Sequence, residues 1–344
     1  MHLDNQTNWS AQTQPGWLRN GQLCHTVVIK ISARFELDGS ITPLPQAAEL
    51  ASGDQYIDES EDRSLACAND MVPFKQGFEW LLTGQVQVAE GRTAQNVTLA
   101  WVRNGQPLQE KTLALFGPRQ WQKTWVGIVP SEPEPLTDIP LQWELAYGGQ
   151  DDSGDEVLAE NPVGQGWFGK SRKAAIGQAM PQIEQQPLLL RPGQRRTPGG
   201  FGPLAPHWAP RQAGFSSLDA ETLSHGESPY QPKTPADLYN AAPQDQRLEQ
   251  SPLVGDAVLL KGFYREAPNL VLTLPTVTPL VFCRADSSRA TRLALQWDTL
   301  LIDTTEQRLD WVFRGALPMA AVPEGACLVV TDPNVEPEAA VHYG

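Results

Sequence analysis

Hydrophobic and polar residues alternate with a period of two along much of the N-terminal part of the chain. In the stretch TVVIKISARFELDG, every second residue from Val27 to Leu37 is apolar, whereas Lys30 and Arg34 fall on the opposite face. This is the period of a strand that packs one face on a core. The pattern therefore predicts a long strand, closed by a turn at Asp38-Gly39.

Residues 1–150 carry further strand patterns of this kind. WLLTGQVQV, from Trp80, alternates again, and LQWELAY places Leu141, Trp143 and Leu145 on one side. VTLAWVR and QPLQEKTLALF are joined by Asn104-Gly105, a dipeptide typical of a two-residue hairpin turn. We therefore predict an N-terminal β-rich part over residues 1–150.

The C-terminal part, residues 253–335, has the same character. AVLLKGFY, NLVLTL and LVFCR are short apolar runs broken by prolines, and LALQWDTLLID and RLDWVFRGAL form a hairpin pattern around residues 304–307. No segment shows a long helical period. The best short helix is TPADLYNAA, in which Thr234 is the N-cap and Pro235 takes the first helical position.

The middle part, residues 151–252, is rich in proline and glycine. Twelve of the chain's 30 prolines fall between Pro181 and Pro252. Proline lacks the N–H that a sheet ladder requires, so this part is not mainly central strand. Its aromatic and leucine residues make it too apolar for a disordered linker, and it is predicted to be an ordered loop excursion packed on the β body.

These patterns together predict a mainly β fold. Antiparallel sheets, arranged as a sandwich or a split barrel, carry the long Pro/Gly-rich excursion and one or two short helices. The three parts are expected to form one composite domain.

The formal net charge is −14, which argues against a nucleic-acid partner because affinity for phosphates comes mainly from Lys and Arg. The basic residues nevertheless gather in residues 161–218, which carry +6 while the rest of the chain carries −20. Two interpretations remain open. Either the basic segment lies on the acidic body and neutralises it, or it forms a docking face for an acidic partner.

Three features of the sequence indicate the cellular compartment of the protein. MHLDNQTNWS has neither the basic nor the apolar region of a secretory signal, and no apolar run approaches the length of a membrane span. The four cysteines lie far apart and are typical of unpaired thiols in a reducing environment. A cytoplasmic protein without a membrane span is expected.

The stretch GGFGPLAPHWAPR, from Gly199, resembles a glycine-rich phosphate loop at first. A phosphate loop needs successive backbone N–H groups followed by a helix N-terminus. Three prolines remove donors here, and they predict that no helix follows. We interpret the stretch as a rigid bent loop that presents Phe201, His207, Trp208 and Arg211 to a protein partner.

Enzyme motifs are absent from the sequence. There is no G-x-S-x-G, and the five histidines are scattered. Counted from Asp151, the stretch that begins DDSGDE has Glu156 where a calcium loop needs glycine and Pro162 where it needs glutamate. No catalytic residue, cofactor or metal site is predicted. The alternative is a carbohydrate-active or other hydrolase that uses an Asp/Glu pair beside an exposed tryptophan. Six tryptophans lie outside clear strands and are candidates for a contact surface: Trp9, Trp17, Trp121, Trp125, Trp167 and Trp208.

Several stretches, taken in order, resemble a known family. They are NDMVPFKQGFEWLLTGQV, LQWELAYGGQD, NPVGQGW, MPQIEQ, GGFGPLAPHWAPRQAGFSS, NAAPQDQ and LQWDTLLIDTTEQRLDWVFRGALP. The series resembles a bacterial family of unknown-function domains encoded beside type VI secretion genes, over about residues 20–320. One loop, AGFSS, departs from the Gly-Thr-Tyr type of turn more usual in the family.

The resemblance implies an adaptor, or effector chaperone, that binds a protein partner. Members of this family are thought to hold a secreted effector, often one linked to a PAAR tip domain, and to help load it on the secretion spike. The family offers no role for the motif residues Asp70 and Lys75, which are interpreted as a structural ion pair. The candidate partner-binding residues are Trp167, Arg191, Arg195, Arg196, Phe201, His207, Trp208 and Arg211.

Overall fold

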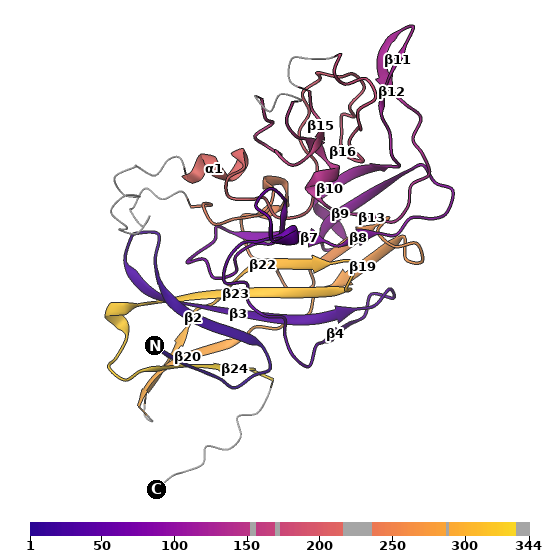
Figure 1. The fold of residues 1–344 in the computed structure, drawn as a ribbon. Coiled ribbons are helices and arrows are strands. Elements are labelled where there is room, and N and C mark those ends of the chain that lie inside the picture. The colour runs from indigo at the N-terminus through magenta and orange to yellow at the C-terminus, as the bar shows by residue number, and fades with distance from the viewer. Residues whose placement is uncertain (152–155, 169–172, 216–235, 287–288, 335–344) are drawn as a thin grey trace.

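The computed structural model describes residues 1–151, 156–168, 173–215, 236–286 and 289–334 of the chain. The prediction of a mainly β fold is confirmed. Most neighbouring strands run antiparallel, and helices are few and short (Figure 1). None of the helices among these residues is long and apolar enough to cross a lipid bilayer.

The main sheet joins the two ends of the sequence. Strand β3 (Leu23–Phe35) pairs antiparallel with β23 (Arg308–Pro318), in register from Arg34↔Arg308 to Cys24↔Pro318. The other strands of this sheet are β2 (Ser10–Trp17), β4 (Ile41–Pro43), β7 (Phe78–Thr83), β17 (Arg247–Leu248) and β22 (Gln296–Asp303). Their order is β17-β7-β22-β23-β3-β2, with β4 beside β3 and with β22 parallel to β7.

Two further sheets flank the main one. The five-stranded sheet has the order β16-β10-β9-β18-β19, and the four-stranded sheet has the order β1-β24-β20-β21. The five-stranded sheet contains β9 (Ala94–Arg103), β10 (Gln106–Phe116), β16 (Ile183–Gln185), β18 (Ala257–Lys261) and β19 (Asn269–Thr273). The four-stranded sheet contains β1 (His2–Asn5), β20 (Leu280–Asp286), β21 (Arg289–Leu293) and β24 (Cys327–Thr331).

Short pairs complete the β structure. They are β5 (Gln55–Tyr56) with β6 (Leu65–Cys67), β8 (Gln85–Val86) with β13 (Ile139–Pro140), β11 (Trp121–Thr124) with β12 (Gly127–Pro130), and β14 (Tyr147–Gly148) with β15 (Gln165–Gly166). Single turns of 3-10 helix lie at Ile57–Glu59, Trp143–Leu145, Gln244–Gln246 and Met319–Ala321.

The predicted hairpins are confirmed, and their turns have the expected backbone. Asn104 and Gly105, between β9 and β10, have φ values of 52° and 73°. Two successive residues of positive φ match the right-handed twist of the strands, which explains why Asn-Gly is favoured there. The β22–β23 hairpin is also present, with Gln307 at φ 50° in its turn.

A shared apolar core lies between the main sheet and the five-stranded sheet. Trp101 of β9 packs edge-on against Phe78 and Trp80 of β7, with ring centroids 4.9 and 5.0 Å apart. The same cluster of buried side chains includes Phe201 from the middle part and Leu328 from β24. All three parts of the chain thus contribute to one core, arranged like a sandwich.

The opposite face of the main sheet is polar, yet it is buried as well. Lys30 and Ser32 of β3 are 3% and 2% exposed, and Glu79 of β7 is fully buried. Backbone of residues 47–51 covers this face, because the Ala48 N–H donates to Ser32 Oγ and Lys30 Nζ donates to the Glu49 carbonyl. The strand alternation identified the polar face correctly but gave no sign that a loop would cover it.

The glycines before Phe201 allow close packing between elements. A Cβ on Gly200 would lie 2.8 Å from three ring atoms of Trp143, and a Cβ on Gly199 would lie 2.8 Å from Leu113 Cδ2. The Phe201 carbonyl accepts from the Leu82 N–H at 3.1 Å, which extends the edge of β7. This stretch therefore packs where the main sheet and the five-stranded sheet meet.

Three local predictions were wrong. Residues 143–145 form a 3-10 turn, although LQWELAY alternates like a strand. A helix, α1 (Ala209–Phe215), does follow the glycine-rich stretch, because Pro210 stands in its first turn, where no N–H is needed. Residues 236–239 of the predicted TPADLYNAA helix form a turn, while Thr234 and Pro235 lie outside the described residues.

The close approach at Gly200 predicts a stability effect. Gly200→Ala should lower the free energy of unfolding by about 1–3 kcal/mol, because Trp143 is enclosed and cannot move aside without strain. Urea unfolding followed by fluorescence measures this. The control is Gly53→Ala, since a Cβ there meets nothing within 4 Å and should cost no stability. Equal stability of the two variants would contradict the packing argument.

Candidate functional site

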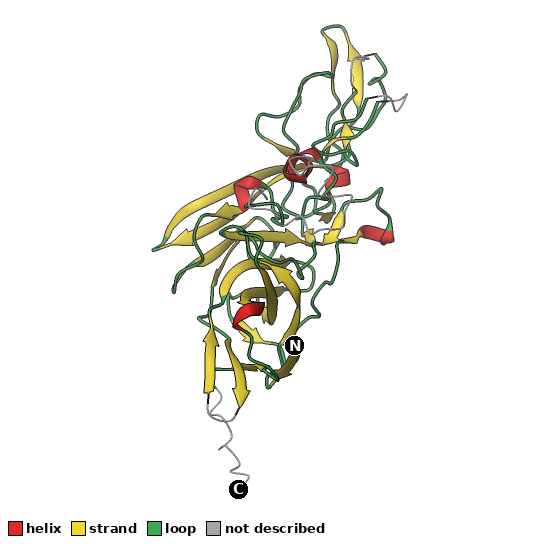
Figure 2. Ribbon diagram, turned by 90° about the vertical axis from the view of Figure 1, so that its left-hand side faces the viewer, coloured by secondary structure: helices red, strands yellow, loops and turns green. Residues whose placement is uncertain are grey.

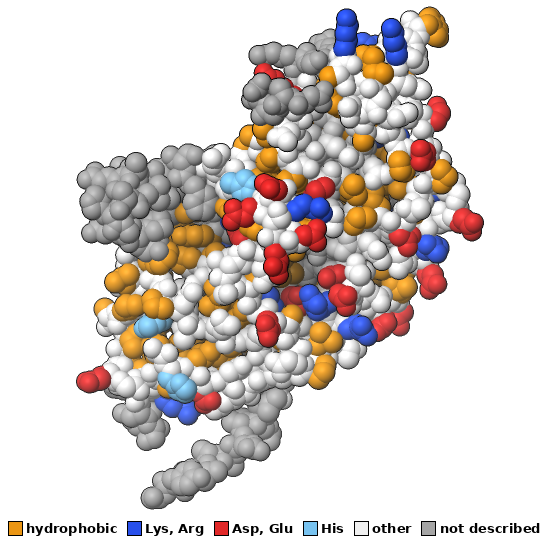
Figure 3. Space-filling view, viewed as in Figure 1, with side chains coloured by type: hydrophobic (Ala, Val, Ile, Leu, Met, Phe, Trp, Pro, Cys, Tyr) orange, Lys and Arg blue, Asp and Glu red, His pale blue; other side chains and the backbone are white. Residues whose placement is uncertain are grey.

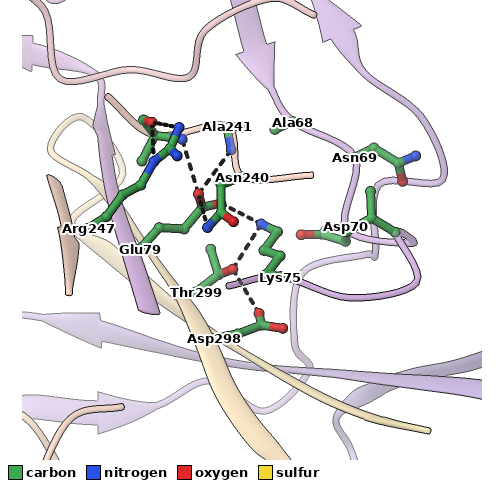
Figure 4. A network of polar contacts seen from close by, with 12 residues as sticks. Ala68, Asn69, Asp70, Lys75, Glu79, Asn240, Ala241, Arg247, Asp298 and Thr299 are labelled. Atoms are coloured by element: carbon green, nitrogen blue, oxygen red, sulfur yellow. Dashed lines mark hydrogen bonds and ion pairs between the residues drawn. The ribbon is translucent and has the colours of Figure 1, made fainter. Parts of the chain in front are cut away.

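A buried polar network lies where the middle part meets the main sheet (Figure 4). Lys75 Nζ pairs with Glu79 Oε1 at 2.5 Å and donates to Thr299 Oγ1 at 2.9 Å. The Thr299 hydroxyl in turn donates to Asp298 Oδ1 at 2.9 Å. Strands β7 and β22 run side by side here, with Glu79 opposite Thr299, so the parallel pairing brings these side chains together.

Glu79 also anchors the returning end of the middle part. Its Oε2 accepts from Asn240 Nδ2 at 3.1 Å and from the Ala241 and Ala242 N–H groups at 2.9 and 3.1 Å. Burial alone would favour the neutral acid, but the charge of Lys75 and these donors hold the pKa of Glu79 below its usual range. Both oxygens accept hydrogen bonds from protein donors, which fits a structural tether.

Asp70 and Lys75 do not pair with each other, contrary to the interpretation of the sequence. Asp70 lies beside Lys75 in Figure 4, but its ion pair is with Lys30, at 2.5 Å, and its Oδ2 accepts from the Ala51 N–H. Arg314 ties the two pairs together by donating to the Asp70 carbonyl at 2.8 Å and to Asp298 Oδ2 at 2.7 Å. Asp70 and Lys75 thus each have an ion-pair partner of their own, and both ion pairs are buried.

A cavity of about 330 Å³ adjoins this network on the polar face of the main sheet. Its lining includes Lys30, Cys67, Arg308 and Asp310. Burial raises the pKa of the Cys67 thiol to about 11, so the sulfur stays protonated at neutral pH and is a poor nucleophile. Asp310 accepts hydrogen bonds from Ser32 Oγ and from Arg308 Nε, so its carboxylate is bonded to side chains of the main sheet.

A second hollow, of about 260 Å³, comes nearest to the predicted hydrolase arrangement. It is lined by Trp143, Glu160 and Asp245, among others. However, Glu160 is paired with Arg195, and Asp245 accepts from Lys111 Nζ at 2.8 Å. Trp143 is only 4% exposed and offers no open ring face to a sugar. The hydrolase alternative stays a prediction, and this hollow gives it no support.

Three of the predicted partner-binding residues are buried, which corrects the idea of a presented loop. Phe201 is 1%, Trp208 0% and Arg211 7% exposed. Phe201 packs on Phe263, and Trp208 packs edge-on against Trp143 at 5.8 Å. Because the glycines have no side chains, this stretch packs closely against the core, and its aromatic residues are buried there.

The other candidates lie nearer the surface than these three. His207 is exposed and stacks on Tyr56 at 6.3 Å. Arg191 and Arg195 are exposed, whereas Arg196 is half-buried and donates to the Leu188 carbonyl. Trp167 is half-buried against a separate small core.

This small core supports a projecting part that we call the hairpin lobe, defined as residues 118–133 with the described residues of 147–196. Its buried side chains are Trp121, Tyr147, Leu158, Phe168, Ala175, Met180 and Leu189. The Trp121 N–H donates to the Gln178 carbonyl, and the Gly177 N–H donates to the Trp121 carbonyl, so the β11–β12 hairpin is tied to residues 177–178. Figures 1 and 2 both show this hairpin extending outward at the top.

The tip of the hairpin carries the most exposed large hydrophobic residue of the part described. Trp125 is 96% exposed and its neighbour Val126 is 62% exposed, between β11 and β12. Val157, Ile176 and Leu190 of the same lobe are 45%, 44% and 58% exposed. A fully exposed tryptophan on a projecting tip has no role in packing its own chain and favours contact with another molecule.

Cations accompany these apolar side chains. Lys123, Lys173 and Arg191 are exposed on the lobe, and none forms an ion pair with another described residue. Figure 3 shows Lys or Arg side chains beside a hydrophobic one at the top of the molecule. The sequence placed Trp125 among six candidate tryptophans but not among the binding residues. The available signal was Trp125-Val126 followed by a glycine, Gly127, whose φ of 128° closes a two-residue turn.

Residues 20–314 match the model of a protein family described as "Uncharacterized protein conserved in bacteria (DUF2169)". The chain belongs to this bacterial family. The match includes the hairpin lobe, the buried network from Asp70 to Arg314 and most of the main sheet. Neither the curated proteins nor the solved structures contain a match to the chain.

The Lys75–Glu79 pair predicts a large effect of removing one partner. Lys75→Met leaves the Glu79 carboxylate buried without its cation and should lower the free energy of unfolding by about 3–5 kcal/mol. Adding Glu79→Gln to that variant should recover part of the loss, because no unpaired charge remains. Chemical denaturation of both variants measures the effect. A single variant as stable as the natural chain would contradict the role of the pair.

The lowered pKa of Glu79 predicts a pH dependence of stability. Its contribution is complete above the ordinary Glu pKa of about 4.3 and is lost as the pH falls through the lower pKa of the folded state. The stability advantage of the natural chain over Glu79→Gln should therefore shrink as the pH is reduced from about 6 to about 3. Denaturation curves across that range test this, and a constant difference would contradict it.

Proposed function

We propose that this protein is a non-enzymatic adaptor, or effector chaperone, that grips a protein partner through the hairpin lobe. The observation that carries the proposal is Trp125, 96% exposed at the tip of a hairpin held by its own small core. Tryptophan is among the residue types that dominate the binding energy of protein interfaces. A rigid tip also loses little conformational freedom on binding.

The charges of the lobe suit an acidic partner surface. The chain as a whole carries −14, yet Lys123, Lys173 and Arg191 stand exposed around the lobe without an ion partner among the described residues. Such charges chiefly speed association and select the partner. The aromatic anchor, which becomes buried only in the complex, chiefly determines how long the complex lasts. That combination suits a protein that must hold its cargo and later release it.

The resemblance of the motifs to proteins encoded beside type VI secretion genes supplies the biological setting. In this proposal the partner is a secreted effector, often linked to a PAAR tip domain, and the adaptor helps load it on the spike in the bacterial cytoplasm. The motif residues Lys75, Glu79 and Asn240 then serve the fold, because their side chains bond one another inside the molecule. The contact residues lie on the lobe instead.

Trp125→Ala tests this proposal directly. The variant should keep its stability, because the ring is exposed, but should bind the partner at least about 30-fold more weakly, which corresponds to about 2 kcal/mol. The assay is co-purification and calorimetry with the product of the effector or spike-tip gene beside its own. The matched control is Leu108→Ala, a 50% exposed residue near the β9–β10 turn, which should bind normally. Undiminished binding by Trp125→Ala, or binding of the natural chain to anionic lipid vesicles in place of any protein, would overturn it.

The cations of the lobe predict a salt-dependent effect. Reversing Lys123, Lys173 and Arg191 to Glu should slow association with the partner about tenfold or more at low ionic strength, and the difference should shrink as salt is added. Stopped-flow or surface-plasmon kinetics measure the rate. The control reverses three exposed cations outside the lobe, Arg92, Lys261 and Arg284. An equal loss in both triple variants would show a general charge effect and no docking face.

A further inference from the structure

The main sheet ends on one side in an open edge. Strand β2 stands last in the order β17-β7-β22-β23-β3-β2, and no strand of the described part pairs with its outer side. Figure 1 shows β2 in the lower half of the molecule, away from the hairpin lobe at the top. An open edge presents unpaired N–H and C=O groups to any extended chain that approaches it.

The register of β2 decides which of its backbone groups face outward. In the turn after β2 the Leu18 N–H donates to the Gln22 carbonyl, and this pair continues the β2–β3 register. Hydrogen-bonded pairs recur at every second residue of an antiparallel ladder, so the even-numbered residues of β2 bond to β3. The backbone groups of Ala11, Thr13 and Pro15 therefore point away from β3.

The other side of β3 agrees with this assignment. The Phe35 N–H donates to the Gln307 carbonyl, in line with the β3–β23 register, so the odd-numbered residues of β3 bond to β23. Its even-numbered residues are then left for β2. The outward direction of Ala11 and Thr13 thus follows from two independent ladders.

The other edges of the three larger sheets are shorter. Strand β2 has eight residues, whereas β1, β4, β16, β17, β19 and β21 have between two and five. The edge of β19 is also covered near its centre. A Cβ on Gly39 would lie 2.7 Å from the Val271 carbonyl oxygen, so the turn at Gly39 lies against this strand.

The open edge carries no charge, although the chain is acidic. Residues 5–18 include no Asp, Glu, Lys or Arg, while 19% of the whole chain is charged and its formal net charge is −14. Charged side chains are a common device that keeps sheet edges apart, and this edge lacks it. Two copies of the chain can therefore meet along β2 without like charges opposite each other.

The outward groups of β2 are also complementary to themselves. If β2 pairs antiparallel with a second copy about Thr13, each Thr13 N–H donates to the Thr13 carbonyl of the other copy. Each Ala11 N–H then donates to the Pro15 carbonyl of the other copy. Pro15 has no N–H, but in this register it is needed only as an acceptor. The outward donors of Ala11 and Thr13 are thus all satisfied.

We propose that two copies of this chain pair antiparallel along β2, with Thr13 opposite Thr13, so that their main sheets join into one. The contact is the same patch on both copies, so it closes as a two-fold dimer and leaves no further edge for growth. Both hairpin lobes stay free, because they lie away from β2. The inference goes beyond the proposed function and does not depend on it.

Sedimentation equilibrium of the full chain tests whether the dimer forms. From about 1 to about 200 μM, the range expected for a small contact, the mass should rise from 37.8 kDa toward twice that value. Added salt should strengthen the dimer, because it screens the repulsion between two acidic copies. A chain that stays monomeric over this range would overturn the inference, whatever covers the edge.

Two kinds of variant test the register. Ala11→Pro removes an outward N–H and should weaken the dimer at least tenfold, whereas the control Ala11→Val keeps the N–H and should dimerise normally. Thr13→Lys and Thr13→Glu should each be monomeric, because they place like charges directly opposite each other. An equimolar mixture of the two should form a heterodimer, since the charges are then opposite in sign.

The outcomes separate this inference from the proposed function. A dimer that Ala11→Pro and both Thr13 variants leave unchanged lies elsewhere and overturns the inference. So does a mixture of the Lys and Glu variants that stays monomeric. Trp125→Ala should dimerise normally, and a loss of the dimer in that variant would place the contact on the lobe. If Ala11→Pro fails to fold, the mixture of the Thr13 variants decides.

Discussion

The ion pair between Lys75 and Glu79 holds the molecule's polar face and its middle part in place. Glu79 is fully buried on β7, and the free energy of burying its charge is recovered only because Lys75 and three N–H donors from residues 240–242 surround it. Those donors return the chain to the main sheet after a long excursion. The network therefore fixes where the excursion rejoins the main sheet.

This arrangement separates the parts that build the fold from the parts available for contact. Several of the motifs that carry the family resemblance meet inside the molecule, in the buried network and around Phe201 and Trp143, whereas NPVGQGW and MPQIEQ lie in the hairpin lobe. The exposed aromatic and basic residues lie on the hairpin lobe, which has a core of its own. In this chain the motif residues Lys75, Glu79 and Asn240 thus serve the architecture.

Much of the fold followed from simple patterns, because strands and tight turns leave local traces. The alternation in β3 and the Asn104-Gly105 turn were both predicted correctly. The errors arose where the outcome depended on distant residues. Phe201 and Trp208 looked like presented aromatics, but their glycine neighbours let them reach Phe263 and Trp143, which are far away in sequence. Likewise, nothing next to Trp125 indicates that its hairpin projects from the body, since that depends on how residues 173–180 support it.

The pairing of β3 with β23 also bears on the order of events during synthesis. The two strands are neighbours in the main sheet, although about 280 residues separate Ser32 from Asp310, whose side chains hydrogen-bond each other. Contacts this distant along the chain form late and make folding slow. A nascent chain can complete its central sheet only after nearly all of it has left the ribosome. Until then, β3 and β7 lack the strands that lie between them in the finished sheet, and apolar surface exposed in this way is prone to aggregation.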